Sequence, residues 1–400
     1  MTRRAYAVII ASFFNISIAY SLRYAYGMLL PEMLPALGIS KTEAGMIYAC
    51  YFIFYTVFTP IFGTFSDLFN YRFIVTLCVA VSAIGSLLMA YADSLLTAGF
   101  FFSLIGLGHA ACWAPVAALV MKWVPIHKRA TALSFVTMGI SFGIPLWSIL
   151  LPIIVSSSGW RTGWLSMGFF GIGVAALNLW LVRNPPVAER TIVSVKESLW
   201  TIWNDYKGFF KNKIFWIIGV AYLLVGFNVL IPFTFLPIYS REFLHLEYAT
   251  STRFFALIAL CGIAGQMTLG RLSDTVGRVN IMILCSLIFG IGCLGLVLSR
   301  TVFALYVCVT FYGIGYGAVW PVYAASAYDF FSKNKIGSVV GLWTVFLGVG
   351  SIISPVLCGW IADKTGGYFW TFGIGFGSGI LSALVLIPLI SLKTKSVPVQ

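Results

Sequence analysis

Apolar residues follow one another along this chain in long runs, and short polar stretches separate one run from the next. A helix that crosses a bilayer needs about 20 consecutive apolar residues, and each run reaches that length. The pattern therefore predicts an all-α membrane protein with twelve transmembrane helices. We expect six helices in the first half, near residues 5–30, 43–66, 72–92, 96–122, 130–155 and 162–183, and six in the second, near 213–239, 250–271, 278–299, 302–328, 336–362 and 368–392.

Composition agrees with this prediction. Of the 400 residues, 60% are hydrophobic and 9% are charged, whereas a soluble domain carries about 25% charged residues. This excludes a soluble enzyme, a nucleic-acid-binding domain and a disordered chain. The eight cysteines lie inside apolar runs without C-x-x-C spacing, which indicates packing residues rather than a metal site or a disulfide framework. The first apolar run is too long for a signal peptide, so we interpret it as the first span.

The basic residues predict the orientation. If both termini are cytoplasmic, 18 of the 25 Lys and Arg residues fall in cytoplasmic segments and 6 fall in segments on the other side. Cytoplasmic loops of membrane proteins carry such an excess. We therefore expect an integral multi-pass protein of a prokaryotic inner membrane, with both termini in the cytoplasm.

The two halves of the sequence repeat each other at a constant offset of 207 residues. Gly63-Thr-Phe-Ser-Asp67 returns as Gly270-Arg-Leu-Ser-Asp274, and the same shift relates Gly143 to Gly350. A single offset across the chain predicts two pseudo-symmetric six-helix bundles, an architecture typical of transporters. We expect an N-terminal bundle at 1–183, a cytoplasmic linker at 184–212 and a C-terminal bundle at 213–400.

These repeated segments carry a family resemblance. Gly63 to Arg72 and Gly270 to Arg278 resemble the signature of the major facilitator superfamily, in which Gly, three residues and Asp precede a basic end. The resemblance implies that the acidic and basic residues of the signature latch the cytoplasmic ends of the helices. The alternative interpretation is solvated loop charges that obey the positive-inside rule. The expected gating residues are Asp67, Arg72, Arg271, Asp274 and Arg278.

Within that superfamily, other segments point to one branch. Trp123-Val-Pro-Ile-His-Lys-Arg129 looks like the loop after helix 4 in monocarboxylate and oxalate:formate transporters. Asp329 through Gly341, and Gly359 through Gly366, resemble the same branch. The resemblance implies the major facilitator fold and an organic anion as substrate.

Arg23 is the one strongly ionised residue well inside a predicted span. An Arg at the centre of a membrane helix costs about 2.5–3.5 kcal/mol on insertion scales, so such a residue usually faces a bundle interior or a water-filled cavity. The alternative is that Arg23 extends to the headgroups. All twelve acidic residues lie near span ends, so none pairs with Arg23 at comparable depth. A guanidinium without a partner suits a carboxylate, which it binds through two parallel hydrogen bonds.

Other candidate substrate contacts follow from the resemblance, which implies that helices 1, 4, 7 and 10 line a central cavity. Tyr20 shares a helix face with Arg23 through its spacing, and His109 and Trp113 are four residues apart on helix 4. For the aromatic residues, His109 and Asn228, packing between helices is the alternative role. The candidates besides Arg23 are Tyr20, His109, Trp113, Asn228, Tyr316 and Trp320.

We interpret the protein as a secondary active transporter that moves a small mono- or dicarboxylate by alternating access. Coupling is open between proton symport, for which His109 is a candidate proton carrier, and anion exchange. We expect no cofactor and no metal, the lipid bilayer as surroundings, and a functional monomer. The rivals are an exporter of amphipathic compounds, a receptor that does not transport, and a membrane-embedded enzyme, which would need a catalytic cluster at membrane depth that the sequence lacks.

Overall fold

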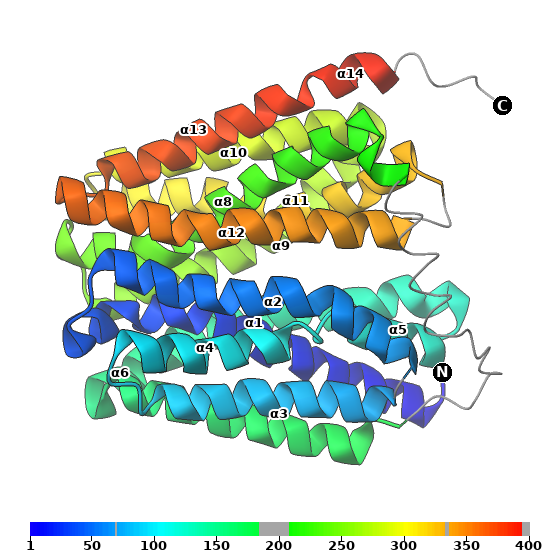
Figure 1. The fold of residues 1–400 in the computed structure, drawn as a ribbon, viewed down its shortest axis with the longest axis horizontal. Helices are drawn as coiled ribbons and strands as arrows, with labels where there is room; N and C mark the ends of the chain where they lie inside the picture. Colours follow the sequence, from blue (N-terminus) through cyan, green and yellow to red (C-terminus); the bar gives the residue numbers. More distant parts are fainter. Residues whose placement is uncertain (69, 184–207, 333–335, 394–400) are drawn as a thin grey trace. The chain divides into compact units, whose positions relative to one another are not determined.

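The computed structural model describes residues 1–68, 70–183, 208–332 and 336–393, and within these ranges the regular structure is helical without a strand (Figure 1). The all-α prediction is confirmed. The elements are α1 Arg3–Leu37, α2 Lys41–Leu68, α3 Tyr71–Met89, α4 Leu95–His109, α5 Ala114–Trp123, the 3₁₀ turn η1 Ile126–Lys128, α6 Arg129–Leu181, α8 Lys213–Glu242, α9 Tyr248–Val276, α10 Arg278–Leu298, α11 Val302–Phe330, α12 Ile336–Thr365, α13 Phe369–Leu386 and α14 Pro388–Lys393.

Across the described residues, 11 helical segments are long and apolar enough to cross a membrane. One of them contains α6, which has 53 residues. A straight helix of that length would be about 80 Å long, more than twice the roughly 30 Å of a bilayer core. Gly159 divides α6, because its φ of 79° is not helical and is one that glycine adopts without strain. The two parts correspond to the predicted spans at 130–155 and 162–183, so the segments account for the twelve predicted spans.

The predicted span at 96–122 is not one continuous helix. It consists of α4 and α5, and residues 110–113 between them are not helical. Pro115 lies in the first turn of α5. A proline inside a helix would clash with the carbonyl four residues earlier, here that of Ala111, and it has no N–H to donate. The break therefore has a local cause that the sequence contains.

The chain divides into two compact units, and each is described by itself. Unit 1 comprises Met1–Pro186, Ile231–Ala259 and Pro355–Tyr368, and unit 2 comprises Val187–Leu230, Leu260–Ser354 and Phe369–Gln400. The predicted bundle boundaries at 183 and 213 stay a prediction. Most of the predicted linker, 184–207, lies outside the described residues.

Equivalent glycines make equivalent helix contacts in the two repeats. A Cβ added at Gly143 of α6 would lie 2.6 Å from the carbonyl oxygen of Ser17 on α1. A Cβ at Gly350 of α12 would lie 2.0 Å from the carbonyl oxygen of Leu223 on α8. Small residues allow membrane helices to approach this closely. Two glycines that are 207 residues apart in the sequence thus both lie where two helices approach closely.

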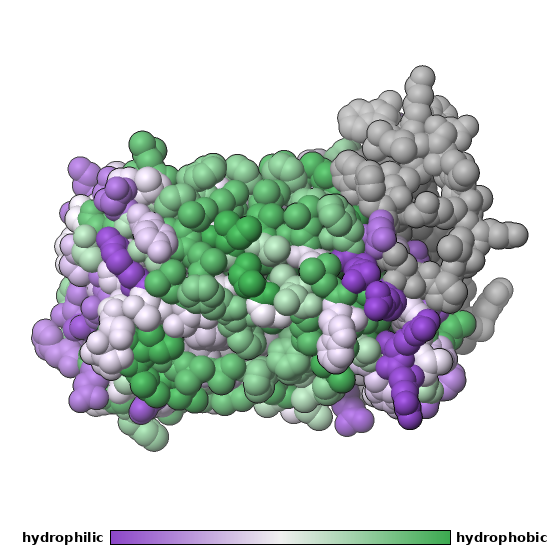
Figure 2. All heavy atoms as spheres, turned by 90° about the horizontal axis from the view of Figure 1, so that it is seen from below, coloured by the Kyte–Doolittle hydropathy of each residue, from purple (hydrophilic) through white to green (hydrophobic). Residues whose placement is uncertain are grey.

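The surface carries the expected hydrophobic zone. On the face that Figure 2 shows, hydrophobic residues fill the middle and hydrophilic residues gather toward the two ends. Many large apolar side chains are exposed, among them Phe73 at 62%, Phe169 at 65% and Trp180 at 74%. Such an extent of exposed apolar surface is unfavourable in water and suits a lipid environment.

Candidate functional site

Arg23 lies on α1, and its side chain is enclosed by aromatic rings. The residue is 3% exposed. Its Cζ lies 4.6 Å from the ring centroid of Phe52 and 5.2 Å from that of Tyr24. The rings of Tyr20 and Tyr55 lie at 5.9 and 5.8 Å. The faces of such rings attract a cation, so the cage stabilises the guanidinium without neutralising its charge.

The hydrogen-bonding capacity of Arg23 is not filled. Its Nε and Nη2 atoms are buried and have no hydrogen-bond partner, and no acidic residue in the described ranges forms an ion pair with it. Buried donors without partners are rare and costly in proteins. Two donor nitrogens of Arg23 therefore carry N–H groups that make no hydrogen bond within the described residues.

Half of this cage comes from α2, which was not among the helices expected to line the cavity. Tyr48, Tyr51, Phe52 and Tyr55 have helical spacing, so they share one face of α2. The hydroxyl of Tyr48 donates to the carbonyl oxygen of Arg23 at 3.0 Å, which fixes α2 against α1. The aromatic period on α2 was the available signal.

His109 belongs to the same cluster. It ends α4, is 2% exposed, and its Nδ1 lies 2.5 Å from the hydroxyl of Tyr51. Its ring centroid lies 4.8 Å from that of Tyr20 and 5.3 Å from that of Tyr55. Tyr20 and Tyr55 therefore each contact both Arg23 and His109. The structure brings together three of the predicted site residues, Arg23, Tyr20 and His109.

Trp113 is placed differently from these three. It lies between α4 and α5, directly before the first residue of α5, and is 44% exposed. None of the ring or cation contacts found among the described residues joins it to the Arg23 cage. Its contact with substrate stays a prediction.

The remaining candidates lie in unit 2. The amide nitrogen of Asn228 on α8 donates to the carbonyl oxygen of Gly375 at 2.6 Å and to the Ser378 hydroxyl at 3.1 Å, so both of its N–H groups bind α13. Asn228 thus holds two helices together in this structure, and its role toward substrate stays a prediction. Tyr316 and Trp320 of α11 contact each other, with ring centroids 5.7 Å apart.

Three of the expected gating residues, Arg72, Asp274 and Arg278, make polar contacts. Arg278 forms ion pairs with Asp329 and, at 3.7 Å, with Asp274, and it donates to the carbonyl oxygen of Ala325 at 2.9 Å. Asp329 was not among the expected gating residues. Arg72 donates to the carbonyl oxygen of Leu179 on α6.

The other two expected gating residues are Arg271 and Asp67. Arg271 is exposed. The side chain of Asp67 lies outside the described residues.

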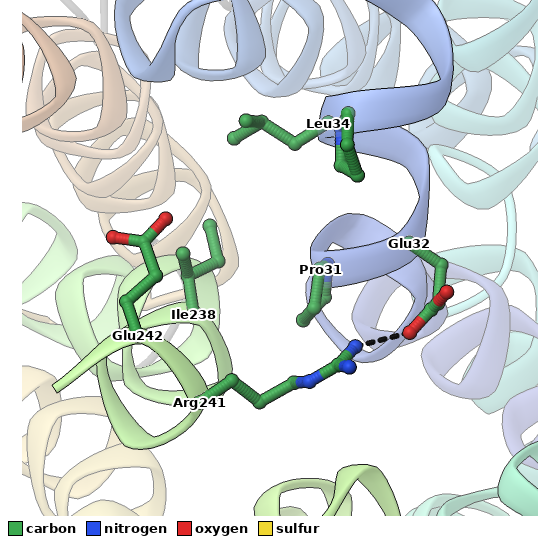
Figure 3. Close-up of a pocket in the computed structure, with 7 residues that line it drawn as sticks. Pro31, Glu32, Leu34, Ile238, Arg241 and Glu242 are labelled. Atoms are coloured by element: carbon green, nitrogen blue, oxygen red, sulfur yellow. Dashed lines mark hydrogen bonds and ion pairs between the residues drawn. The ribbon is translucent and has the colours of Figure 1, made fainter. Parts of the chain in front are cut away.

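A cavity of about 350 Å³ lies elsewhere in unit 1, beside the C-terminal ends of α1 and α8. Its charged lining consists of Glu32, Arg241 and Glu242, and Figure 3 shows Arg241 directed at Glu32, with which it forms an ion pair. Glu242 is paired with Lys41 at 2.9 Å. Every charge of this cavity has an ionic partner, whereas no acidic residue in the described ranges forms an ion pair with Arg23.

Comparison with known proteins identifies the family. The sequence model of the Major Facilitator Superfamily matches residues 12–267 and 254–399. The probable sulfoacetate transporter SauU of Cupriavidus necator is 20% identical, covering 94% of this chain and 92% of that protein. The probable galactarate/D-glucarate transporter GudP of Bacillus subtilis is 26% identical, covering 88% and 85%. The membrane sensor protein UhpC of Salmonella typhimurium is 22% identical, covering 96% and 91%.

Solved structures show the same fold. The nucleoside transporter NupG matches with a TM-score of 0.77 at 14% identity, covering 97% of this chain and 99% of that one. A bacterial homologue of the lysosomal transporter Spinster, in an inward-facing and unoccupied conformation, matches with a TM-score of 0.76 at 16% identity, covering 98% and 97%.

Proposed function

Since this chain belongs to the Major Facilitator Superfamily, we propose that it is a secondary transporter of a small organic anion that carries a carboxylate. The substrate binds Arg23 and is moved across the membrane by alternating access. The observation that carries this proposal is the arginine itself, a cation 3% exposed inside a membrane helix with two nitrogens that have no partner.

The energetics of Arg23 favour an anionic ligand. Insertion scales assign about 2.5–3.5 kcal/mol to an arginine at the centre of a membrane helix. The aromatic cage offsets a part of this insertion cost. A cation–π contact contributes about 0.5 kcal/mol where it is exposed and about 2 kcal/mol where it is buried. A carboxylate that accepts from both Nε and Nη2 would fill the vacant donors and neutralise the charge. The site is therefore expected to be less stable when it is empty than when a carboxylate is bound to Arg23.

The relatives support the same class of substrate. The transporters named above are described for sulfoacetate and for galactarate or D-glucarate, and a gentisate transporter of Corynebacterium glutamicum is 25% identical, covering 99% of this chain and 90% of that protein. These compounds differ in their carbon skeletons, and each carries a carboxylate. Arg23 is the residue of this chain that suits the shared group.

The buried charge of Arg23 in the empty site also bears on how transport is coupled. Reorientation of the empty carrier would move a buried charge that no acidic residue in the described ranges neutralises, so transport is expected to require the loaded site. Anion exchange and proton symport both satisfy this condition. In symport, His109 and its neighbour Tyr51 are the candidate groups for the proton, because they lie in the Arg23 cluster.

We also propose that both termini face the cytoplasm of a prokaryotic cell and that the monomer is functional. The orientation rests on the excess of Lys and Arg in the segments that would then be cytoplasmic. The ends at which α1 and α8 finish would then face the outside.

Counterflow of labelled carboxylates in proteoliposomes tests the function. We expect wild type to exchange at least one of a set that includes sulfoacetate, glucarate and gentisate, and Arg23→Ala to lose this flux. Arg300→Ala is the matched control, because Arg300 is exposed and its replacement removes the same charge. Normal carboxylate flux in Arg23→Ala would overturn the proposal, and binding without flux would assign the chain a sensor role instead.

A further inference from the structure

One end of unit 1 is held together by charged residues from distant parts of the chain. We call it the distal end, and it is the end at which α1 and α8 finish and α2 and α9 begin. The carboxylate of Asp363 on α12 accepts from the backbone N–H of Lys41 at 3.1 Å, from that of Thr42 at 2.8 Å and from the Thr42 hydroxyl at 2.5 Å. Asp363 therefore caps the N-terminus of α2 from 321 residues away along the chain.

The N-terminus of α2 also has a local cap, formed by Ser40 and Glu43. The Ser40 hydroxyl accepts from the N–H of Glu43 at 3.2 Å, and the Glu43 carboxylate accepts from the N–H of Ser40 at 2.8 Å. The first N–H groups of α2 lack intrahelical partners, as in any helix, and Asp363 serves those that the local pair leaves. The helix dipole of α2 favours an acidic group at this position, whereas the dipole of α12 disfavours one near its own C-terminus. The position of Asp363 thus stabilises the contact between the helices rather than α12.

Glycine makes this contact possible. A Cβ added at Gly359, one turn before Asp363, would lie 2.2 Å from the carbonyl oxygen of Lys41. A Cβ added at Gly45 of α2 would lie 2.2 Å from the carbonyl oxygen of Pro355. Both distances are far below a van der Waals contact, and the obstacle is backbone in each case. The cap by Asp363 therefore depends on glycine at position 359.

Two ion pairs act beside the cap. Lys41 pairs with Glu242 of α8 at 2.9 Å, and Tyr368 donates to the same carboxylate at 3.0 Å. Arg241 pairs with Glu32 of α1 across the cavity in Figure 3. Below them, the rings of Tyr24 and Phe233 lie 4.1 Å apart. Tyr24 also contacts the Arg23 guanidinium, at 5.2 Å, so one residue joins this aromatic pair to the proposed anion site.

The spacing of Gly359 and Asp363 occurs twice more in the chain, as Gly63 with Asp67 and Gly270 with Asp274. The copy at 270–274 is not engaged in the same way. Within unit 2, a Cβ at Gly270 would meet nothing within 4 Å, and the Asp274 side chain is 70% exposed. The same five-residue arrangement is thus packed and capping at the distal end of unit 1 and open in unit 2.

We propose that Gly359 and Asp363 form a latch that holds the distal end closed and must release α2 before the anion site opens on that side. Release breaks the hydrogen bonds from Lys41 and Thr42 to Asp363 and leaves water to replace the carboxylate. The latch acts on the equilibrium between closed and open forms and makes no contact with substrate, so both residues are positioning residues.

The test measures access to the buried interior without any substrate. Thr234 of α8 is fully buried and its hydroxyl has no partner, so Thr234→Cys serves as a reporter for a membrane-impermeant maleimide. The protein without the added cysteine is the blank for its eight native cysteines. We expect Asp363→Ala to raise the labelling rate from the distal side about fivefold, the equivalent of the roughly 1 kcal/mol of a helix N-cap at 1.4 kcal/mol per tenfold.

Gly359→Ala should raise the rate in the same direction, because the added methyl group separates α12 from α2. The matched control is Gly341→Ala on the same helix, since a Cβ at Gly341 meets nothing within 4 Å. The control should label at the rate of the reporter alone. If Asp363→Ala fails to fold, Thr42→Val removes the hydroxyl donor while keeping the shape of the side chain, and it should raise the rate less.

Right-side-out and inverted membrane vesicles complete the design. A latch predicts faster labelling from one side only, and that side also reports which way the distal end faces. Equal acceleration from both sides would indicate general loosening and would overturn the proposal, as would unchanged rates in both Asp363→Ala and Gly359→Ala. Since no substrate is used, these outcomes do not depend on whether the anion proposal holds.

Discussion

The guanidinium of Arg23 lies 4.6 Å from the ring centroid of Phe52, its nearest aromatic contact, and the two residues come from different helices. Arg23 is a charged residue within the apolar run of α1. Phe52 is an apolar residue, for which hydropathy predicts burial but no particular partner. Their contact shows how α2 makes room for a charge in unit 1 without supplying an acid.

Replacing Phe52 by leucine should destabilise the protein, because leucine keeps most of the apolar volume and loses the ring that faces the cation. We expect a loss of about 1–2 kcal/mol, measured as a lower midpoint of thermal unfolding in detergent. Phe73→Leu is the control, since Phe73 is 62% exposed. Equal midpoints for the two variants would contradict a stabilising role of the ring for Arg23.

The Tyr51–His109 hydrogen bond gives a second prediction. Tyr51→Phe keeps the ring and removes the hydroxyl, so a buried imidazole nitrogen loses its partner at a cost of about 1–3 kcal/mol. Thermal unfolding measures this cost. Tyr91→Phe, at a tyrosine that is 71% exposed, should change the midpoint little, and an unaffected Tyr51→Phe would mean that the hydrogen bond contributes nothing.

A third prediction concerns Asn15 and Asn178, which exchange amide hydrogen bonds of 3.1 and 2.7 Å between α1 and α6. Either single replacement by leucine leaves one buried amide without its partner, which costs more than the hydrogen bond itself contributes. The double replacement removes both polar groups. We therefore expect the double variant to be more stable than the sum of the single losses implies, and a double-mutant cycle on unfolding midpoints to give a coupling of about 0.6–1.7 kcal/mol. Strict additivity would show that the pair is not coupled.

The fourth prediction ranks two acidic partners of Arg278. Asp329 forms the closer ion pair and has a side chain that is 20% exposed, whereas Asp274 lies at 3.7 Å and is 70% exposed. Exposed pairs contribute only about 0–1 kcal/mol. We expect Asp329→Asn to change the initial rate of counterflow more than Asp274→Asn does. The reverse order would return the leading role to the signature residue Asp274.

Much of the architecture was predictable because hydropathy acts along the chain. Apolar length located the spans, and the repeat of glycine and aspartate implied two related halves. The isolated position of Arg23 was equally visible, since a charge in an apolar run is a local property. The break at Pro115 and the turn at Gly159 also had local causes, although the predicted span at 96–122 consists of two helices, α4 and α5, rather than one.

What the tertiary structure decided is which side chains meet. The spacing of residues along a helix does not indicate that Tyr51 binds His109 or that Tyr20 and Tyr55 each contact both His109 and Arg23. Nor does it indicate that the side-chain amide of Asn228 donates to α13. Asp363 is only one of several acidic residues at span ends until it is found capping α2. Hydropathy along a helix determines that the helix lies in the membrane, but contacts between residues hundreds of positions apart depend on how the helices pack, and that information appears only in the folded chain.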